Sequence, residues 1–118
     1  MAYVDGFVVP VPKDNVERYR EFASKAGAVW KECGALEFHE CVADDVKPGK
    51  VTSFPQAVKL EPNEVVVFSW IVYKSCEHRD EVNAKVMKDP RMESMGPDKM
   101  PFDGKRMIYG GFKPVVEM

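Results

Sequence analysis

Glu64 to Tyr73, with the sequence EVVVFSWIVY, is the stretch that decides the fold. Its two alternating faces are both largely apolar, with Val66, Phe68, Trp70 and Val72 on one face and Val65, Val67, Ile71 and Tyr73 on the other. β-Branched and aromatic residues at this density are typical of a strand that is covered on both sides. We therefore expect a central strand, with helices over one face and a second copy of the protein over the other.

The composition bounds the size and class of the protein. A chain of 118 residues is in the range of one domain, so we predict a single domain over residues 1–118. The formal net charge of -2 argues against nucleic acid as a partner, because nucleic-acid binding needs a concentrated basic surface. No apolar run reaches the roughly 20 residues that span a bilayer, and no signal peptide is evident. We expect a cytoplasmic protein without membrane contact.

The cysteines indicate neither a disulfide framework nor a zinc site. Cys33, Cys41 and Cys76 are odd in number and lack CxxC spacing, so we expect reduced thiols and no metal. The sequence also lacks a glycine-rich phosphate loop, a nucleophile elbow and an HExxH pair. We expect no cofactor.

The first half of the chain predicts two further strands around a long helix. An alternating strand over residues 3–9 should end at Pro10-Val11-Pro12, and Asp14 with Glu17 has the form of a capping box that starts a helix. The apolar three- and four-residue spacing continues to Cys33, and Gly34 is a natural stop. Residues 35–42 predict a charged edge strand. We interpret residues 43–63 as irregular, either hiding a short strand or helix or acting as a functional flap.

The second half predicts a helix, a short helix and a last strand. Ser75 is a plausible cap for a helix that runs to about Lys88, and Asp89-Pro90 can cap a further short helix through Met95. Residues 96–104 predict a loop. Residues 105–116 predict a strand in which Gly110-Gly111 suggests a bulge or a close backbone approach.

The resulting order is a split βαββαβ, an α+β fold of ferredoxin-like type with the first and third strands in the centre. We place the helices on the Val4 and Val8 face of the first strand, where Gly6 would let a helix come close. The other face would then carry Tyr3, Phe7, Tyr109 and either Trp70 or Tyr73, which is too much apolar area to leave in water. Two such sheets packed face to face would form a symmetric homodimer.

Several long strings resemble a known family: YVDGFVVPVP, ECVADDV, TSFPQAV, VVFSWIVY and MPFDGKRMIYGGF. Taken together over nearly the whole chain, they resemble the bacterial DUF1428 family, the YbaA-like proteins. The resemblance implies a small cytoplasmic protein with a ferredoxin-like fold in the dimeric α/β-barrel group. It implies no established reaction and no catalytic residues.

Four residues combine types that would bind an organic molecule, namely Asp5, Trp70, Arg106 and Tyr109. They would supply a carboxylate, a guanidinium and two aromatic surfaces, and Asp5, Arg106 and Tyr109 are the candidates for catalysis. A structural salt bridge of Asp5, for example to Arg106, is the alternative to an acid/base role. His39 and Glu40 point to opposite faces of their strand, and we interpret both as edge residues with local hydrogen bonds.

Two classes of function remain open, and whether the protein is an enzyme is undecided. The first is binding or transformation of a small organic molecule without metal, oxygenase- or isomerase-like by analogy with the fold, held between sheet and helices or within the barrel. The second is a non-catalytic dimer that acts through its surface and the 43–63 segment. A polar-lined cavity would favour the first class, and a closed apolar interior the second.

Overall fold

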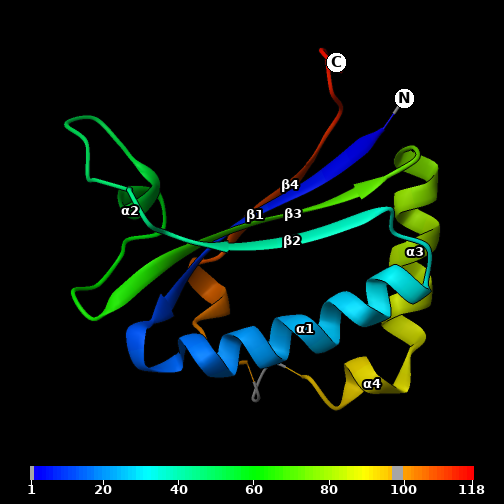
Figure 1. The fold of residues 1–118 in the computed structure, drawn as a ribbon, viewed down its shortest axis with the longest axis horizontal. Helices are drawn as coiled ribbons and strands as arrows, with labels where there is room; N and C mark the ends of the chain where they lie inside the picture. The colour runs from blue at the N-terminus through cyan, green and yellow to red at the C-terminus, as the bar shows by residue number, and fades with distance from the viewer. Residues whose placement is uncertain (1, 97–99) are drawn as a thin grey trace.

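The computed structural model describes residues 2–96 and 100–118, and a four-stranded antiparallel sheet forms its centre (Figure 1). The strands are β1 (Tyr3–Pro12), β2 (Glu37–Val42), β3 (Glu64–Tyr73) and β4 (Ile108–Phe112). They lie in the order β2-β3-β1-β4, so the doubly apolar stretch Glu64–Tyr73 is a central strand, as predicted. The predicted α+β class and strand order are confirmed. Residues 97–99 of the predicted loop lie outside the described residues.

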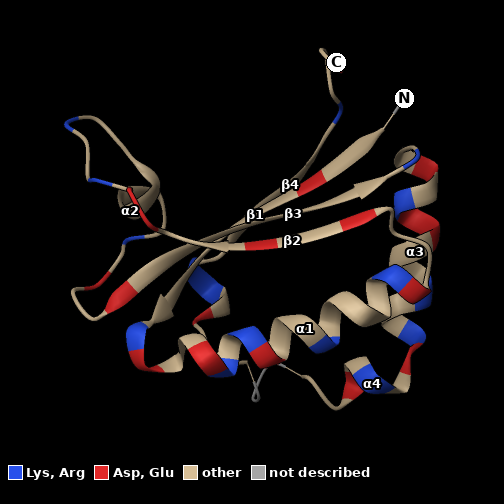
Figure 2. Ribbon diagram, viewed as in Figure 1, with Lys and Arg blue, Asp and Glu red and all other residues tan. Residues whose placement is uncertain are grey.

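Two long helices cover one face of the sheet, α1 (Val16–Glu32), which runs below it in Figure 1, and α3 (Cys76–Lys88), which descends at its right-hand end. Shorter elements complete the fold: η1 (Lys13–Asn15), α2 (Phe54–Ala57), α4 (Pro90–Glu93) and η3 (Gly104–Arg106). The 43–63 segment therefore does hide a short helix, and it rises from the side of the sheet opposite to α1. Most charged residues lie on the helices and loops, while the strands carry few (Figure 2).

The predicted helix ends are confirmed at three places and wrong at one. Ser75 Oγ accepts from His78 N at 3.0 Å, and Asp89 Oδ1 accepts from Arg91 N at 2.9 Å. Gly34 follows α1 with φ +121°, a conformation that favours glycine at a helix end. The capping box at Asp14 does not form, because the chain makes a 3-10 turn there and α1 begins only at Val16.

Strand β1 continues through Pro10 and Pro12, further than the sequence predicts. The N–H of Lys13 points to the β3 side, where it donates to Asn63 O at 2.8 Å. Because N–H direction alternates along a strand, N–H groups at the two proline positions would point away from β3. The pairing of β1 with β4 ends at Val8, so the ladder needs no donor on that side. Both prolines therefore fit within the strand.

The helices cover the face of the sheet that carries Tyr3, Asp5 and Phe7, so our assignment of that face to the bare side was wrong. Tyr3 and Phe7 pack against the buried cluster formed with α1 and α3. Tyr109 lies opposite Phe7 in the ladder and stacks on it at 6.2 Å between ring centroids. Gly6 faces away from the helices, so it does not admit one. The alternation of side chains along β1 divides them between two sheet faces. Because both faces are apolar, the sequence of β1 does not indicate which one the helices cover.

The bare face is therefore the one that carries Val4, Phe68, Trp70, Val72 and Phe112. Phe68 and Phe112 are 41% and 63% exposed. The 43–63 segment covers one end of this face, where Val58 packs on Val8 and Val66. We call the remainder the open sheet face.

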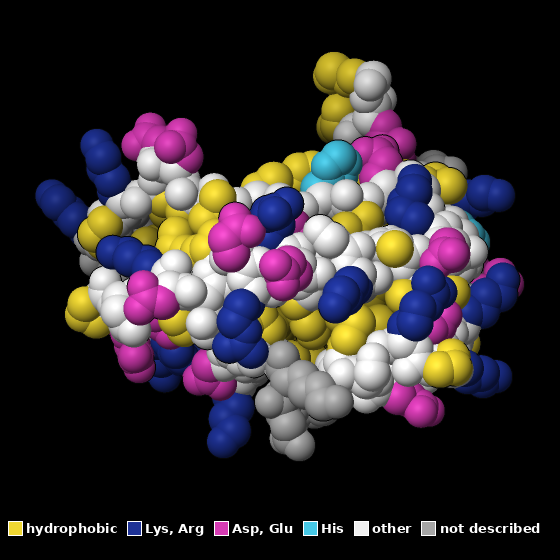
Figure 3. All heavy atoms as spheres, turned by 60° about the horizontal axis from the view of Figure 1, so that its bottom comes forward, with side chains coloured by type: hydrophobic (Ala, Val, Ile, Leu, Met, Phe, Trp, Pro, Cys, Tyr) yellow, Lys and Arg dark blue, Asp and Glu magenta, His cyan; other side chains and the backbone are white. Residues whose placement is uncertain are grey.

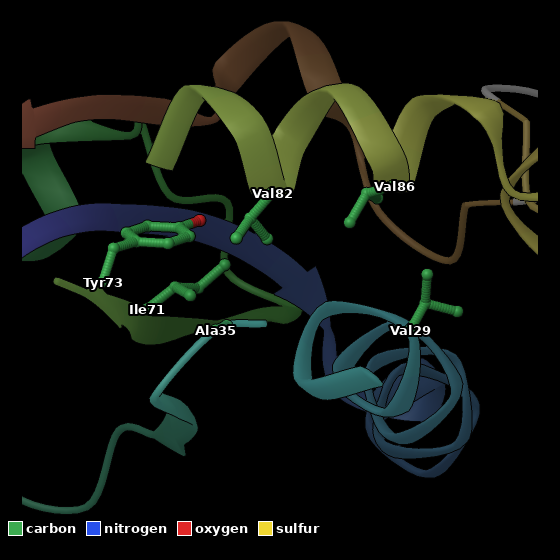
Figure 4. Close-up of a cluster of buried hydrophobic side chains, with 6 residues drawn as sticks. All are labelled: Val29, Ala35, Ile71, Tyr73, Val82 and Val86. Atoms are coloured by element: carbon green, nitrogen blue, oxygen red, sulfur yellow. The ribbon is translucent and has the colours of Figure 1, made fainter. Parts of the chain in front are cut away.

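The main core lies between the sheet, α1 and α3 (Figure 4). Its buried members come from β3, both helices and the turn after α1: Val29, Ala35, Ile71, Tyr73, Val82 and Val86. Met87 on α3 lies outside this cluster and is 62% exposed. A second cluster around Val9, Val11 and Tyr19 continues the core toward the start of α1.

The last strand is shorter than predicted. Lys105 and Arg106 lie in η3, and β4 begins at Ile108. The ladder runs without interruption past Gly110 and Gly111, so the bulge does not occur. The predicted close approach to the backbone does occur, because a Cβ on Gly111 would collide with the ring of Tyr3. Among the helices of residues 2–96 and 100–118, none has the length and apolar character that a membrane crossing requires.

Candidate functional site

A groove of about 500 Å³ lies between α1 and the edge strand β2, on the helix side of the sheet. We call it the α1–β2 groove. Its wall is mainly apolar and comes from α1, β2 and the central strands: Val11, Val16, Tyr19, Arg20, Ala23, Ser24, Gly27, Ala28, Lys31, Phe38, Glu40, Cys41, Val42 and Val67. Figure 3, which turns the helix side toward the viewer, shows apolar side chains exposed between Lys and Arg side chains on this face.

Small residues on α1 create the space for this groove. Ala23, Gly27 and Ala28 recur at helical spacing along its wall, so the helix presents little side-chain volume there. A Cβ on Gly27 would lie 2.8 Å from a ring carbon of Phe38, which means that only glycine lets this ring rest against α1. Phe38 in turn packs on Trp30 at 6.2 Å between ring centroids. The ring therefore forms part of a fixed wall.

One hydrogen-bonded polar pair stands in this apolar wall. Tyr19 Oη donates to Glu40 Oε1 at 2.7 Å, across the space between α1 and β2. Tyr19 is 8% exposed and packs edge-on against Phe102, which holds the phenol in place. Glu40 itself is exposed to solvent, although apolar side chains surround its carboxyl group. Ser69 lies opposite Glu40 in the β2–β3 ladder.

The surroundings of this pair shift both pKa values upward. Burial among apolar side chains raises the pKa of Glu40, while hydrogen bonds from Tyr19 and Ser69 partly offset that rise. Burial, followed by the charge of Glu40, raises the pKa of Tyr19. The pair therefore combines a carboxyl group that holds a proton more readily than usual with a phenol that stays a hydrogen-bond donor.

Asp5, a predicted site residue, forms a buried ion pair that is remote from the groove lining. Arg79 Nη1 donates to Asp5 Oδ1 at 2.7 Å, and the side chains are 23% and 9% exposed. Arg79 also donates to Asp80 and lies over the ring of Tyr3 at 4.9 Å. Desolvation raises the pKa of Asp5 even though Arg79 opposes it. The suggested partner Arg106 was wrong, since Arg79 on α3 occupies that position.

Arg106, the second predicted residue, lies at the other end of the molecule and clamps the start of β3. Its Nη1 and Nη2 donate to the two oxygens of Glu64 at 2.7 and 2.6 Å, and Nη1 also donates to Lys59 O at 3.0 Å. Asp103 accepts from its Nε at 3.0 Å. These hydrogen bonds, led by that of Arg106, hold the pKa of Glu64 below its usual range. The clamp ties the 43–63 segment to the turn before β4.

The two predicted aromatic residues lie on opposite sides of the sheet. Trp70 is on the open sheet face, where it stacks on His39 at 4.5 Å between ring centroids. Tyr109 is on the helix side at the β4 edge and is 72% exposed. Within one chain the structure therefore does not bring Asp5, Trp70 and Tyr109 together, and Arg106 has its own partners.

Sequence reasoning missed the importance of Glu40, although the signal was present. Glu40 shares a strand face with Phe38 and Val42, so it is a carboxylate in an otherwise apolar row. We interpreted it as an edge residue with a local hydrogen bond. Its partner Tyr19 is 21 residues away on α1, a pairing that strand alternation cannot reveal.

Residues that could bind a metal are not grouped in the described parts of the chain. Within residues 2–96 and 100–118, no three His, Cys, Asp or Glu side chains lie close enough to hold an ion. The polar groups that the α1–β2 groove can offer a ligand come from its own side chains, namely Glu40, Tyr19, Ser24, Cys41, Arg20 and Lys31.

Comparison with solved structures supports the fold alone. The chain is similar to an uncharacterized NIPSNAP domain protein from Burkholderia xenovorans, with a TM-score of 0.65 and 15% identity over 97% of this chain and 95% of that one. A NIPSNAP family protein from Agrobacterium tumefaciens strain C58 has a TM-score of 0.59 and 13% identity, covering 98% of this chain and 94% of its own.

Sequence comparison gives the family. The model of DUF1428, described as a protein of unknown function, matches residues 2–104. The uncharacterized protein YbaA of Escherichia coli strain K12 is 60% identical over 117 residues, which cover 99% of both chains, and YbaA of Shigella flexneri matches equally. The resemblance noted from the sequence is thus confirmed, and the chain belongs to the DUF1428 family.

Proposed function

We propose that the protein binds a small, mainly apolar organic molecule in the α1–β2 groove, and that the molecule carries a polar group for Glu40 and Tyr19. The observation that carries this proposal is the groove itself, an apolar hollow with one hydrogen-bonded polar pair in its wall. Binding sites for organic molecules have this composition, because apolar surface supplies affinity and a few fixed polar groups supply orientation. The volume of about 500 Å³ is within the range of such sites.

We further propose that the protein acts as a cytoplasmic homodimer of the ferredoxin-like, dimeric α/β-barrel type, joined through the open sheet face. Apolar side chains such as Phe68, Trp70 and Phe112 on that face support the proposal, since a patch of this kind is rarely left to water. The α1–β2 groove lies on the other side of the sheet, so dimer formation would leave it accessible. Sedimentation at micromolar concentration is the direct test, and a folded monomer near 13.4 kDa would contradict it.

A thermal-shift screen with apolar carbonyl, phenol and carboxylic compounds tests the proposed binding. We expect hits in the apolar carbonyl group, with a stabilisation of about 2.7 kcal/mol when the ligand is at 100 times its Kd. Ala28→Trp should remove the shift, because Ala28 is an exposed position on α1 that lines the groove, where an indole would fill the space.

Ala84→Trp is the matched control, since Ala84 is an exposed alanine on α3 away from the groove lining. It should keep the full shift of every hit. If Ala28→Trp and Ala84→Trp respond alike, the hits bind elsewhere and the groove is not the binding site.

A second candidate function is a non-catalytic protein that acts through the 43–63 segment. Val46, Val51 and Phe54 of this segment are exposed, and Phe54 borders a small apolar hollow with Phe68 on the open sheet face. Exposed apolar side chains on a raised loop favour contact with another protein. Loss of partner capture or of dimer formation in a Val51→Ser, Phe54→Ser variant, with groove binding retained, would support this reading.

A further inference from the structure

We propose that Glu40 is a general base that removes and returns the α-proton of an apolar, enolisable carbonyl compound bound in the α1–β2 groove, with Tyr19 as its positioning residue. This inference rests on the proposed function, because it needs a ligand in the groove. It adds a reaction, a substrate class and a role for each member of the polar pair.

Position is the first argument for Glu40. Among the described residues that line the groove it is the one carboxylate. Its neighbours on the same face of β2 and β3 are Phe38, Val42 and Val67, together with the directly paired Ser69. A ligand that fills the apolar groove must therefore lie next to this carboxylate. General bases act at this range, within one hydrogen bond of the proton that they remove.

Tyr19 is the second argument, because it fixes the carboxylate. Its hydroxyl donates to Oε1 at 2.7 Å, and its ring is held by Phe102 and by burial in the core beside Val11. A carboxylate on an edge strand would otherwise sample several rotamers. Holding the base in one geometry lowers the entropic part of the barrier.

The basicity of Glu40 fits this task. Desolvation by the apolar groove wall raises its pKa, so the carboxylate is a stronger base than a fully solvated one. The titratable or charged groups that line the groove with it are Tyr19, Arg20 and Lys31 from α1 and Cys41 from β2. Arg20 donates to Glu17 and Lys31 donates to Leu36 O, so both cations already have partners in the protein.

These partners narrow the substrate class. An enolate needs its negative charge stabilised, and cations with existing partners give less help to a ligand oxygen. The substrate must therefore carry a C–H that is already acidic, flanked by a carbonyl and by either a second carbonyl or an aromatic ring. An apolar body of this kind also suits the groove wall.

The proposed step balances without any co-reactant. The C–H bond breaks as an O–H bond forms on Glu40, the C–H electron pair becomes the C=C bond of the enolate, and the negative charge moves to the carbonyl oxygen. The proton on Glu40 then returns to the same carbon, which exchanges that hydrogen, or to the enolate oxygen, which gives the enol. The reaction class is therefore keto–enol tautomerisation.

The test uses 2-tetralone, an apolar ketone whose C1–H lies between a carbonyl and an aromatic ring. Proton NMR in D₂O follows exchange of the C1 hydrogens for deuterium, and saturation-transfer NMR measures binding of the same compound. We expect the wild-type protein to accelerate exchange over buffer, and Glu40→Gln to lose about 100-fold or more of that acceleration while it still binds.

Glu37→Gln is the matched control, because Glu37 is three positions before Glu40 on β2 and therefore lies on the opposite sheet face, outside the groove lining. It should keep the wild-type rate. Tyr19→Phe should still bind 2-tetralone but should accelerate its hydrogen exchange less than the wild type does. The midpoint of its pH–rate profile should also move to higher pH, because the hydrogen bond from Tyr19 lowers the pKa of Glu40. A purely structural role of Tyr19 would leave that midpoint unchanged.

The outcomes separate this inference from the proposed function. Groove binding stands if 2-tetralone binds the wild type and Ala28→Trp abolishes that binding. Proton transfer by Glu40 is nevertheless refuted if the wild type does not accelerate exchange, or if Glu40→Gln exchanges as fast as the wild type. If the wild type does not bind 2-tetralone, groove binding of apolar carbonyl compounds is refuted together with the proton transfer. Should Glu40→Gln fail to fold, Glu40→Asp keeps the charge but withdraws it by one methylene, and an unchanged rate there would also refute the inference.

Discussion

Replacing Gly27 with alanine tests how α1 and β2 define the groove. An added Cβ would lie 2.8 and 2.9 Å from two ring carbons of Phe38 and 3.3 Å from a third. Ordinary contacts of this kind begin at 3.4 Å, so the ring or the helix must move by about 0.6 Å. Trp30 packs against Phe38 at 6.2 Å between ring centroids, which hinders movement on that side. We expect the ring to shift into the groove.

Two effects of opposite sign decide the stability of Gly27→Ala. Alanine is favoured over glycine within a helix by about 1 kcal/mol. Overpacking a fitted site costs about 1–3 kcal/mol. The expected net result is a loss of about 1 kcal/mol in the free energy of unfolding. Ligand binding in the groove should weaken as well, because Phe38 would occupy part of the space.

Urea unfolding of Gly27→Ala, Phe38→Leu and the double variant measures both effects. With the smaller leucine at position 38 the clash is relieved, so Gly27→Ala should become stabilising by about 1 kcal/mol in that background. If Gly27→Ala already stabilises the wild-type protein by about 1 kcal/mol, Phe38 is not held against α1, and the account of a fixed groove wall is refuted.

Three further predictions concern the residues that the sequence brought forward. Arg79→Met should lower the free energy of unfolding by roughly 2–3 kcal/mol, because it leaves the buried Asp5 carboxylate unpaired, whereas Asp5→Asn should lower it less, because Arg79 keeps its contacts with Asp80 and the Tyr3 ring. Urea unfolding that gives the reverse order of the two variants would contradict this. The pKa of Glu64 is lowered in the fold, so the stability from its pair with Arg106 is fully present above about pH 4.5 and is lost as the pH falls through the folded pKa. Glu64→Gln should therefore make the plot of unfolding free energy against pH flatter in acid, and an unchanged plot would show that this pair does not cause the loss of stability. Thiol titration of the denatured protein should find three free groups, as the three cysteines are free in the structure, and a lower count would indicate a disulfide.

Much of the fold could be predicted from local patterns. The doubly apolar run of β3 indicated a central strand, and the charges on residues 35–42 indicated an edge strand, and both positions are confirmed. Ser75 and Asp89 were found as caps because a cap is a local arrangement of side chain and backbone within three residues. Asp14 has the same local form, yet the preceding turn leaves it outside the helix.

The predicted site could not be obtained in the same way, because it depended on which face of the sheet the helices cover. The pattern of β1 divides its residues into two sets and does not say which set faces the helices. In the structure Asp5 and Tyr109 are on the same face of the sheet, and Trp70 is on the other. The partner of Asp5 was also out of reach, since Arg79 lies 74 positions away on a helix whose rotation is set by packing.

Glu40 shows why a groove is harder to predict than a core. A core is indicated by residues that are present, whereas the α1–β2 groove exists because Ala23, Gly27 and Ala28 leave space on one side of α1. Small residues on a helix commonly indicate close packing and not an open space. Gly27 does allow close packing, but only with the ring of Phe38. The rest of the space between α1 and β2 stays open as the groove. A carboxylate in an apolar row of an edge strand, opposite a helix rich in small residues, is therefore the combination of signals that would have predicted this site.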